Sequence, residues 1–389
     1  MSLGRKLKYG MVGGGPGAFI GAVHRMAAAL DGAMELVAGA FSADPGKSRQ
    51  QGAELLLDPA RVYTSFAEMA EKEAALSDGE RIDFVSIVTP NHVHFPAAKV
   101  FIEAGIHVVC DKPMTNTLEN AEALCRLVHH HGVEFALTHN YTGYPMVKQA
   151  RAMVAAGEIG EVLKVIVEYP QGWLATPLER TGHKQAGWRT DPKRAGAGSL
   201  GDIGSHADNL ARYVTGLELE ALCADVTTFV AGRPIDDDVS MLLRFNGGAR
   251  GVLHASQISV GEENNLNIRV HGSSGSLQWF QEHPNWLHCR TLDGPEQVLK
   301  RGNDYLSAIA QHNSRLPSGH PEAFIEAFAN IYSNFGRTIA ARMVGDEPSA
   351  FDTDFPSVQD GARGVHFILS ALESGSTRSW VDARYSPPA

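Results

Sequence analysis

The first 140 residues alternate between strand-like and helix-like segments, and this alternation constrains the fold more than any other feature. Short apolar runs such as Phe84–Val88 are typical of buried strands, and amphipathic stretches such as Leu118–His131 are typical of helices. The expected order is strand 8–12, helix 20–30, strand 35–42, strand 84–88, helix 95–104, strand 107–110, helix 118–131 and strand 134–138. Such alternation produces right-handed crossovers, so we expect a doubly wound parallel α/β sheet over residues 1–140.

From residue 162 onward the apolar segments become longer and often alternate in polarity. The expected strands are 162–168, 239–245, 251–258 and 266–271, and Asn246–Gly247 is a hairpin turn signal. Residues 177–201 are rich in Gly, Pro, Lys and Arg, which predicts a long loop. We therefore expect residues 141–389 to form an α+β domain with a large, open, mostly antiparallel sheet.

Composition and charge narrow the possible partners. The chain has 389 residues, of which 43% are apolar and 20% charged, as expected for a folded protein of two domains. Its formal charge of -10 repels polyanions, so we expect no nucleic-acid partner and no membrane partner. No apolar run approaches the roughly 20 residues that cross a bilayer, and the first residues lack the apolar stretch of a signal peptide. These features predict a cytoplasmic location.

Cysteine and histidine usage gives no sign of a metal site. The four cysteines, at positions 110, 125, 223 and 289, include no C-x-x-C pair, which indicates reduced thiols. The tract His129–His131 precedes Gly132 at an expected helix end, where cationic side chains are favourable. We therefore expect no metal ligands.

A glycine-rich stretch joins the first expected strand to the first expected helix. Glycines at such a junction let the backbone turn sharply and approach a pyrophosphate at the helix N-terminus. Gly13, Gly15 and Ala18 fit the pattern G-x-G-x-x-A, whereas Gly21 is the third glycine if the turn carries a short insertion. Both interpretations predict a dinucleotide site.

The end of the second expected strand leaves the choice between NAD and NADP open. An acidic residue about 20 positions after the glycines would bind the ribose hydroxyls of NAD. Ser42 with Lys47 or Arg49 could accept the additional phosphate of NADP, whereas Asp44 would oppose it. The expected cofactor is NAD or NADP, and the balance favours NAD.

Asp202 and His206 lie four residues apart where a glycine-rich stretch leads into an amphipathic helix. This spacing places two side chains on one helical face, where both can reach a common target. Alternatively, Asp202 caps the helix, Gly216 closes it and His206 is a surface residue.

Three further motifs, together with the glycine turn, produce a family resemblance. They are Thr89–His94 after the third strand, Cys110–Pro113 after the fourth, and Gly201–His206 in the second half. The sequence thereby resembles the glucose-fructose oxidoreductase and inositol dehydrogenase family, Gfo/Idh/MocA. The resemblance implies an NAD(P)-binding, Rossmann-type first domain over residues 1–140 and a second domain over residues 141–389 that binds substrate and mediates oligomerisation. Beyond Gly216 it rests on the strand pattern alone.

The resemblance implies roles for individual residues. Lys112 matches the active-site lysine of the family's E-K-P motif, with Asp111 in the glutamate position, and Asp202 and His206 match the D-x-G-x-H pair that faces the substrate. The expected catalytic residues are Lys112, Asp202 and His206. The expected cofactor-binding residues are Gly13, Gly15, Pro16, Phe19, Ile20, Ser42, Lys47, Thr89, Pro90, Asn91, His94, Asp111, Lys112, Asn140, Trp188 and Arg189. The expected substrate-binding residues are Lys112, Tyr141, Tyr144, Arg189, Asp202 and His206.

These residue types suit the oxidation of an alcohol. Histidine titrates near neutrality and can accept the hydroxyl proton, a carboxylate can orient it, and a lysine ammonium stabilises developing alkoxide charge. We expect an NAD(P)-dependent dehydrogenase that oxidises a secondary hydroxyl of a sugar, glycoside or cyclitol. An NAD-dependent glycosidase that oxidises transiently and a non-catalytic nucleotide sensor are the alternatives.

The second domain also predicts self-association. Apolar residues occupy both faces of strands such as Met241–Leu243 and Val252–Leu253, so one face of the open sheet needs a cover. A second subunit would provide it, which predicts a homodimer or homotetramer.

Overall fold

The structure is a computed structural model that describes residues 3–389 and divides into two compact units. Unit 1 combines the chain up to Asn140 with Ile325–Ala362 and Pro387–Ala389, and unit 2 contains Tyr141–Phe324 and Arg363–Ser386. The segment Ile325–Ala362 belongs to unit 1, where Phe335 packs against Phe84.

Unit 1 contains a parallel sheet, as expected. Among the described residues its strands are β1 (Leu7–Gly13), β2 (Met34–Ala40), β3 (Phe84–Val88), β4 (His107–Cys110) and β5 (Phe135–Leu137). They lie in the order β2-β1-β3-β4-β5, so β2 and β3 lie on opposite sides of β1 and the strand order reverses there. All five residues of β3 are buried, as is typical of a strand covered on both faces.

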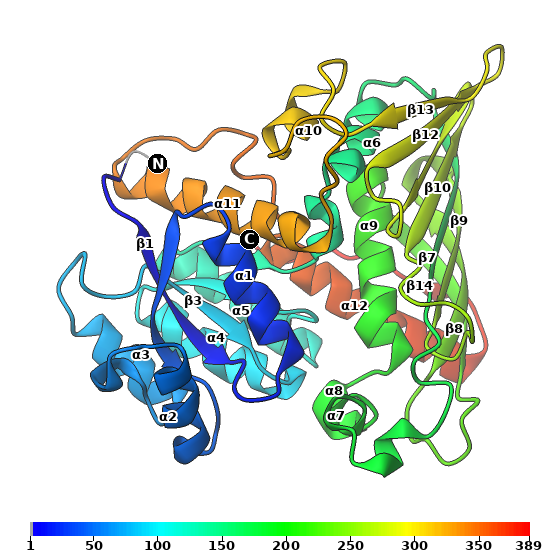
Figure 1. Ribbon diagram of the computed structural model, residues 1–389. Helices are drawn as coiled ribbons and strands as arrows, with labels where there is room; N and C mark the ends of the chain where they lie inside the picture. The colour runs from blue at the N-terminus through cyan, green and yellow to red at the C-terminus, as the bar shows by residue number, and fades with distance from the viewer. Residues whose placement is uncertain (1–2) are drawn as a thin grey trace. The chain divides into compact units, whose positions relative to one another are not determined.

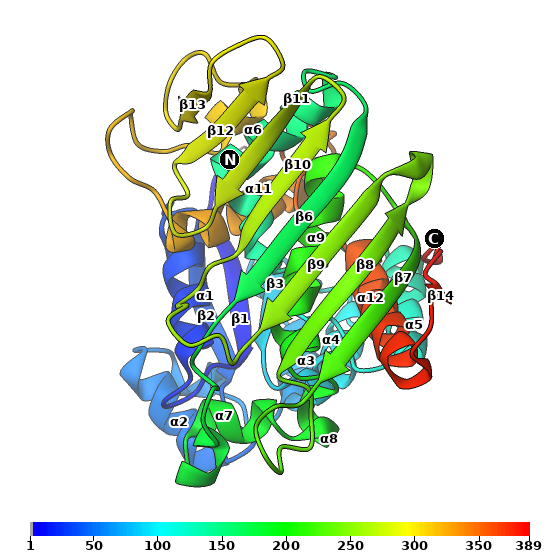
Figure 2. The same cartoon turned by 90° about the vertical axis from the view of Figure 1, so that its right-hand side faces the viewer.

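Helices cover both faces of this sheet. They are α1 (Phe19–Ala29), α2 (Pro45–Glu54), α3 (Phe66–Ala74), α4 (His94–Glu103), α5 (Leu118–His131) and α11 (Phe324–Met343). Helices α1 and α11 lie on one face, and α3, α4 and α5 lie in a row on the other (Figures 1 and 2). Helix α11 is held there by aromatic contacts, including an edge-to-face contact between Phe335 and Phe84 with ring centroids 5.4 Å apart.

Unit 2 is built on a large, mostly antiparallel sheet. Within residues 3–389 its strands are β6 (Val162–Pro170), β7 (Leu219–Thr227), β8 (Asp238–Phe245), β9 (Arg250–Ser256), β10 (Asn267–Gly272), β11 (Gly275–Phe280), β12 (Trp286–Thr291), β13 (Gln297–Lys300) and β14 (Val381–Asp382). Their order is β13-β12-β11-β10-β6-β9-β8-β7-β14, and among these described strands only β6 and β9 pair in parallel (Figure 2). The hairpin between β8 and β9 turns at Asn246–Gly248, as predicted, with Gly247 at φ 71°.

Helices cover one face of the unit 2 sheet. They are α6 (Pro145–Ala155), α9 (Ser205–Thr215) and the C-terminal part of α12 (Val358–Thr377). The short α10 (Ala308–His312) packs against α6. In the described part of the chain no helix covers the other face of the sheet (Figure 2). Along β8, buried residues alternate strictly with less buried ones, and the less buried ones point to this uncovered face.

The expectation of a long loop over residues 177–201 is wrong, because most of that stretch is helical. It contains the 3₁₀ turn Leu178–Thr181, α7 (Lys184–Arg189) and α8 (Pro192–Ala195), and residue Leu200 begins a further helical segment. Local capping explains α7 and α8: His183 accepts a hydrogen bond from the Ala186 N–H, and Asp191 accepts one from the Lys193 N–H. Pro192 then occupies a first-turn position that needs no N–H donor.

Two further expectations concern the whole described chain. In the described part of the chain Cys110, Cys125, Cys223 and Cys289 form no disulfide bond, and all but Cys223 are buried. Among residues 3–389 no helix combines the length and the apolar character needed to span a bilayer.

Candidate functional site

The glycine turn lies between β1 and α1 in unit 1. The Ala18 N–H donates to the Gly15 carbonyl at 3.0 Å, which closes a β-turn with Pro16 and Gly17 at its centre. Proline favours the first central position, and the φ of 74° at Gly17 is the left-handed value that glycine adopts readily. Helix α1 then begins at Phe19, with Ile20 in its first turn.

The structure resolves which residue serves as the third glycine. A Cβ added to Gly21 would lie 2.5 Å from the Cα of Gly14, so only glycine permits this approach of helix and turn. Ala18 instead lies just before the helix in an extended conformation. The interpretation with a short insertion is therefore the one that matches the close-packing role of the third glycine.

The residues after β2 are held by local hydrogen bonds. The Ser42 hydroxyl accepts from the Asp44 N–H at 3.1 Å, and the Asp44 carboxylate caps α2 by accepting from the N–H groups of Gly46 and Lys47. The Lys47 side chain is exposed. A carboxylate therefore lies at the point where the ribose of a dinucleotide is expected.

The loop after β3 and the turn after β4 are joined by His94. This buried ring lies with Nδ1 2.8 Å from the Pro113 carbonyl oxygen and Nε2 2.9 Å from the Thr89 carbonyl oxygen. Burial lowers the pKa of His94, so the neutral ring donates to only one of these carbonyls at a time. Its expected contact with the nucleotide stays a prediction, and its visible contacts connect two loops.

Asp111 and Lys112 form the turn after β4, and a cis peptide bond joins Lys112 to Pro113. The Asp111 carboxylate is held within this turn. Its Oδ1 accepts from the Thr138 hydroxyl at 2.8 Å and from the Lys112 backbone N–H at 3.0 Å. The Lys112 side chain is half-buried.

Two buried polar atoms in unit 1 fit the expected nucleotide. Among the described residues, neither the Thr89 Oγ1 nor the Asn140 Nδ2 has a hydrogen-bond partner. Leaving a buried polar atom unpaired costs about 1–3 kcal/mol, so a ligand is expected to pair with them. Both residues were expected to bind the cofactor, and both follow strands at the edge where a doubly wound sheet binds its ligand. The residues present therefore fit a bound dinucleotide.

In unit 2, Asp202 and His206 lie on one continuous helical segment. A π-helical turn, Leu200–Gly204, leads directly into α9, which ends at Gly216 in the left-handed conformation. π-Helical turns within α-helices occur frequently at functional sites. Asp202 lies inside this segment, so the alternative in which it caps the helix is wrong.

The cap instead comes from a residue far along the chain. The buried Asp236 carboxylate accepts from the Gly198 N–H at 2.7 Å, the Ser199 hydroxyl at 3.0 Å and the Leu200 N–H at 2.8 Å. Gly198 permits this approach, because an added Cβ would lie 1.8 Å from the Asp236 carbonyl oxygen. The residue that starts the helix was thus not visible from local sequence.

Two donors converge on the carboxylate of Asp202. Its Oδ2 accepts from the Gln257 Nε2 at 2.8 Å and from the Arg189 Nε at 3.2 Å. The Arg189 guanidinium also lies over the Trp188 ring, 4.3 Å from its centroid. The structure therefore brings Trp188, Arg189 and Asp202 together, and it adds Gln257, which the sequence analysis missed.

The rings of Tyr141 and Tyr169 contact the His206 ring. The Tyr141 ring meets the His206 ring edge to face with centroids 4.8 Å apart, and the Tyr144 ring is stacked on Tyr141 at 6.2 Å. Tyr141, Tyr169 and Asn264 form a closed ring of hydrogen bonds, in which Tyr169 donates to the Asn264 Oδ1 at 2.6 Å and the Asn264 Nδ2 donates to Tyr141 at 3.3 Å. Burial raises the pKa of both tyrosines, so their hydroxyls stay protonated at neutral pH.

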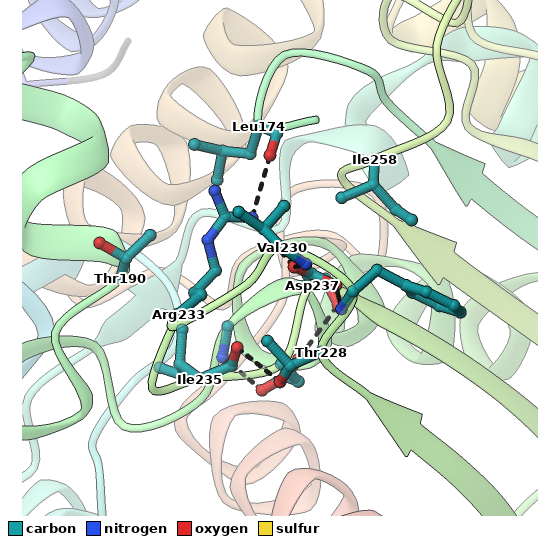
Figure 3. Close-up of polar contacts among 12 residues, drawn as sticks. Leu174, Thr190, Thr228, Val230, Arg233, Ile235, Asp237 and Ile258 are labelled. Atoms are coloured by element: carbon teal, nitrogen blue, oxygen red, sulfur yellow. Dashed lines mark hydrogen bonds and ion pairs between the residues drawn. The ribbon is translucent and has the colours of Figure 1, made fainter. Parts of the chain in front are cut away.

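A buried arginine anchors the segment that leads to α7. The Arg233 guanidinium donates to the carbonyl oxygens of Leu174 at 2.9 Å and Thr176 at 3.0 Å, and it pairs with Asp237 at 3.1 Å (Figure 3). Asp237 in turn accepts from the N–H groups of Phe229 and Val230. These contacts attach the chain before Arg189 to the loop between β7 and β8.

The expected site residues fall into two groups. Gly13, Gly15, Pro16, Phe19, Ile20, Ser42, Lys47, Thr89, Pro90, Asn91, His94, Asp111, Lys112 and Asn140 belong to unit 1, and Tyr141, Tyr144, Trp188, Arg189, Asp202 and His206 belong to unit 2. Gln257 and Asp236 were not expected from the sequence. Gln257 lies near the end of the expected strand 251–258, and Asp236 lies three residues before the expected strand 239–245, so both are close to connecting segments, where chains often place functional side chains. Within residues 3–389 no group of three His, Cys, Asp or Glu residues could hold a metal ion.

The glycine turn at the start of the doubly wound sheet defines a dinucleotide-binding fold, and the helix with Asp202 and His206 adds groups of the kind that move protons in oxidoreductases. The chain belongs to the Gfo/Idh/MocA family. Residues 7–139 match the oxidoreductase family with an NAD-binding Rossmann fold, and residues 147–278 match the GFO/IDH/MocA C-terminal domain. It is accordingly an NAD(P)-dependent oxidoreductase that acts on CH–OH groups, with NAD or NADP as cofactor.

Relatives resemble the chain over nearly its whole length. The uncharacterized oxidoreductase YfiI of Bacillus subtilis is 33% identical over 385 residues, which cover 98% of each chain. A levoglucosan dehydrogenase of Pseudarthrobacter phenanthrenivorans is 30% identical over 403 residues and covers 97% of this chain and 98% of its own. The crystal structure of an inositol dehydrogenase homolog from Azotobacter vinelandii, complexed with NADH and myo-inositol, is 36% identical, covers 98% of each chain and has a TM-score of 0.90.

Proposed function

We propose that this chain oxidises a secondary hydroxyl of a sugar, glycoside or cyclitol and transfers the hydride to a nicotinamide nucleotide. The observation that carries the proposal is the arrangement around Asp202, whose carboxylate is held by Arg189 and Gln257 four residues before the buried His206. Relatives named for levoglucosan and for myo-inositol support the same substrate class, since both molecules are uncharged polyols.

In this proposal His206 accepts the proton of the reacting hydroxyl. Tyr141 contacts the ring edge to face and limits its rotation. Histidine is the residue suited to this role, because the neighbouring hydroxyls of Tyr141 and Tyr169 stay protonated. Asp202 binds a neighbouring hydroxyl or orients the imidazole.

Lys112 supplies the positive charge that stabilises the developing alkoxide. Its backbone is held by the Asp111 carboxylate, which also accepts from Thr138. The bound nicotinamide supplies the hydride acceptor.

The proposed cofactor preference is NAD over NADP. Asp44 places a carboxylate just after β2, where it would repel the additional phosphate of NADP. The exposed Lys47 would favour that phosphate, so the preference is expected to be modest. Comparing kcat/KM with the two nucleotides tests the choice, and a higher value with NADP contradicts it.

We also propose that a second copy of the chain covers the free face of the unit 2 sheet. Leu242 is 53% exposed on that face, and its cross-strand neighbours are Cys223 on β7 and Val252 on β9. Val252 in turn pairs with Ile166 on β6, which continues the apolar stripe. The other residues named from sequence, Met241, Leu243 and Leu253, are buried on the opposite face.

Sedimentation tests this association. The wild-type protein is expected to sediment as a dimer or tetramer of the 41.9 kDa chain at micromolar concentration. Leu242→Asp is expected to shift it toward the monomer, and Ser240→Asp on the same strand and face but outside the stripe serves as the control. A wild-type monomer overturns the proposal.

A substrate panel tests the function itself. Polyols, sugars and glycosides are assayed with NAD and NADP while NAD(P)H absorbance is followed. Steady NAD(P)H production with at least one polyol or sugar is expected. Release of a free sugar from a glycoside without net NAD(P)H would instead identify transient oxidation, and nucleotide binding without turnover of any compound would indicate a sensor.

A further inference from the structure

A chain of buried polar side chains crosses one face of the unit 1 sheet. It joins Ser86 on β3, Tyr332 on α11 and His24 on α1. The Tyr332 hydroxyl lies 2.7 Å from both the Ser86 Oγ and the His24 Nδ1, and all three residues are fully buried. None of these residues was expected to contribute to function, and Tyr332 is 308 positions from His24.

The second ring nitrogen of His24 faces the turn after β4, which carries Asp111 and Lys112. Within residues 3–389 the buried His24 Nε2 has no hydrogen-bond partner, and its near neighbour is the Asp111 Oδ1 at 3.9 Å. That oxygen is the one that accepts from Thr138 and from the backbone N–H of Lys112. His24 therefore faces the atom that organises the turn carrying Lys112.

The hydrogen bond made at Nδ1 sets the tautomer of His24, and two hydroxyls lie against this nitrogen, that of Tyr332 at 2.7 Å and that of Ser86 at 3.3 Å. Burial lowers the pKa of His24 to about 4, so the ring is neutral near pH 7 and holds a single proton. When the Tyr332 hydroxyl donates to Nδ1, the proton lies on Nε2 and the N–H dipole points toward the Asp111 carboxylate. The other tautomer would point a lone pair at that carboxylate, which is electrostatically unfavourable.

We infer that His24, oriented by Tyr332, is a positioning residue that stabilises the Asp111 carboxylate and thereby holds the Lys112 turn in place. The inference rests on the proposed function in one respect, namely the role of Lys112 in catalysis. It gives α11, from the C-terminal segment Ile325–Ala362, a part in the site that the fold of the first 140 residues alone does not supply.

Tyr332→Phe is the central variant, because it removes the hydroxyl and keeps the ring. A roughly tenfold lower kcat is expected, the size that loss of one buried orienting hydrogen bond produces, with nucleotide affinity within about twofold of wild type. Tyr63→Phe is the matched control, since its buried hydroxyl donates to Glu73 at 2.7 Å elsewhere in unit 1. An equal loss of kcat in both variants, or no loss in Tyr332→Phe, overturns the inference.

A double-mutant cycle tests whether the effect passes through Asp111. If it does, Tyr332→Phe lowers kcat in the wild type but changes it less than twofold in an Asp111→Asn background. If the double variant instead loses kcat by the product of the two single-variant losses, Tyr332 acts by another route and the inference is overturned. His24→Gln, which keeps a donor and an acceptor, is expected to retain more turnover than His24→Leu.

A spectroscopic measurement is independent of turnover. With ¹⁵N-labelled histidine, the His24 signal, assigned by its absence in His24→Gln, is expected to report the Nε2–H tautomer in wild type and to lose it in Tyr332→Phe. A dominant Nδ1–H tautomer in wild type overturns the inference. Full turnover in Lys112→Ala contradicts the proposed function instead, and the tautomer result still decides the orientation of His24.

Discussion

The two units present their candidate functional groups by different means. In unit 1 the parallel strands end at one edge of the sheet, and the groups that fit a nucleotide lie on the short loops that follow them. In unit 2 the pair Asp202 and His206 lies on a helix, and its supporting groups come from distant segments, namely Arg189, Gln257 and Asp236.

The difference indicates which kind of substitution should impair the candidate site of each unit. Unit 1 relies on backbone geometry, as at Gly21, where a Cβ would lie 2.5 Å from Gly14. Unit 2 relies on side-chain hydrogen bonds that cross between elements. We therefore expect changes at the glycine turn and at Thr89 in unit 1 to alter nucleotide affinity, whereas changes at the Asp202–His206 helix alter turnover.

The largest expected effect separates these two properties. His206→Ala should lower kcat by about 10²- to 10⁴-fold, since it removes a positioned proton acceptor, while nucleotide affinity and fold are retained. Steady-state kinetics, calorimetry with the nucleotide and circular dichroism measure the three quantities. His271→Ala, on an exposed part of β10, is the control. A kcat within about twofold of wild type, or an unfolded variant, would favour a structural role for His206.

The second prediction concerns acid, which should weaken unit 1 before unit 2. Burial lowers the pKa of His24 and His107 to about 4 and of His139 to about 3. The unfolded chain therefore binds more protons below pH 6.5, and stability falls from pH 6.5 toward pH 4 by up to about 1.4 kcal/mol per pH unit for each histidine. His254 in unit 2 behaves oppositely, because its hydrogen bond to Asp238 raises its pKa; its contribution is present below pH 6.5 and is lost as the pH rises.

Tryptophan fluorescence distinguishes the units, since all five tryptophans lie between residues 173 and 380 in unit 2. In urea at pH 5.5, circular dichroism should begin to change at a lower concentration than fluorescence, whereas the two transitions should lie closer together at pH 7. His131→Gln, an exposed histidine, should change neither. Transitions that coincide at both pH values and do not move would contradict the prediction.

The third prediction tests the long-range cap of the Asp202–His206 helix. Asp236→Asn replaces a carboxylate that accepts three hydrogen bonds and should lower stability by about 1–3 kcal/mol, with a drop in kcat as the helix start loosens. Asp191→Asn alters the more exposed cap of α8 and should cost less. Chemical denaturation measures both, and equal losses in the two variants would argue against a special role for Asp236.

The smallest expected effect is on nucleotide affinity. Thr89→Val removes the unpaired Oγ1 and should weaken nucleotide binding about fivefold without lowering stability, as expected for one hydrogen bond made only to the ligand. Thr115→Val is the matched control, because its hydroxyl donates to the Thr117 carbonyl within the protein. Thr115→Val should lower stability and leave nucleotide affinity unchanged. If Thr89→Val instead lowers stability and leaves nucleotide affinity unchanged, Thr89 does not belong to the nucleotide site.

Gly15→Leu is a less specific test of the same site. A Cβ at this position would lie 2.6 Å from the Phe41 carbonyl oxygen, so the substitution displaces the end of β2 as well as blocking a pyrophosphate. Thr89→Val avoids this ambiguity because it preserves the side-chain shape.

Much of unit 1 was predictable from the sequence because its signals are local. The bounds of β3, β4 and α5 match the expected segments, since apolar periodicity and the Gly132 C-cap act within a few residues. The helical content of 177–201 was missed, because Gly, Pro and basic residues conceal caps such as His183 and Asp191.

The sequence by itself determined the alternation of elements, the glycine turn, and the positions of Lys112, Asp202 and His206. Only the tertiary structure decided that Gly21 is the third glycine, that Asp236 starts the Asp202–His206 helix, and that α11 places Tyr332 against His24. The physical reason is the range of the interactions. Backbone propensities and periodic burial act between neighbouring residues, whereas a carboxylate 34 positions from Asp202 or a hydroxyl 308 positions from His24 comes into contact only when distant elements pack together.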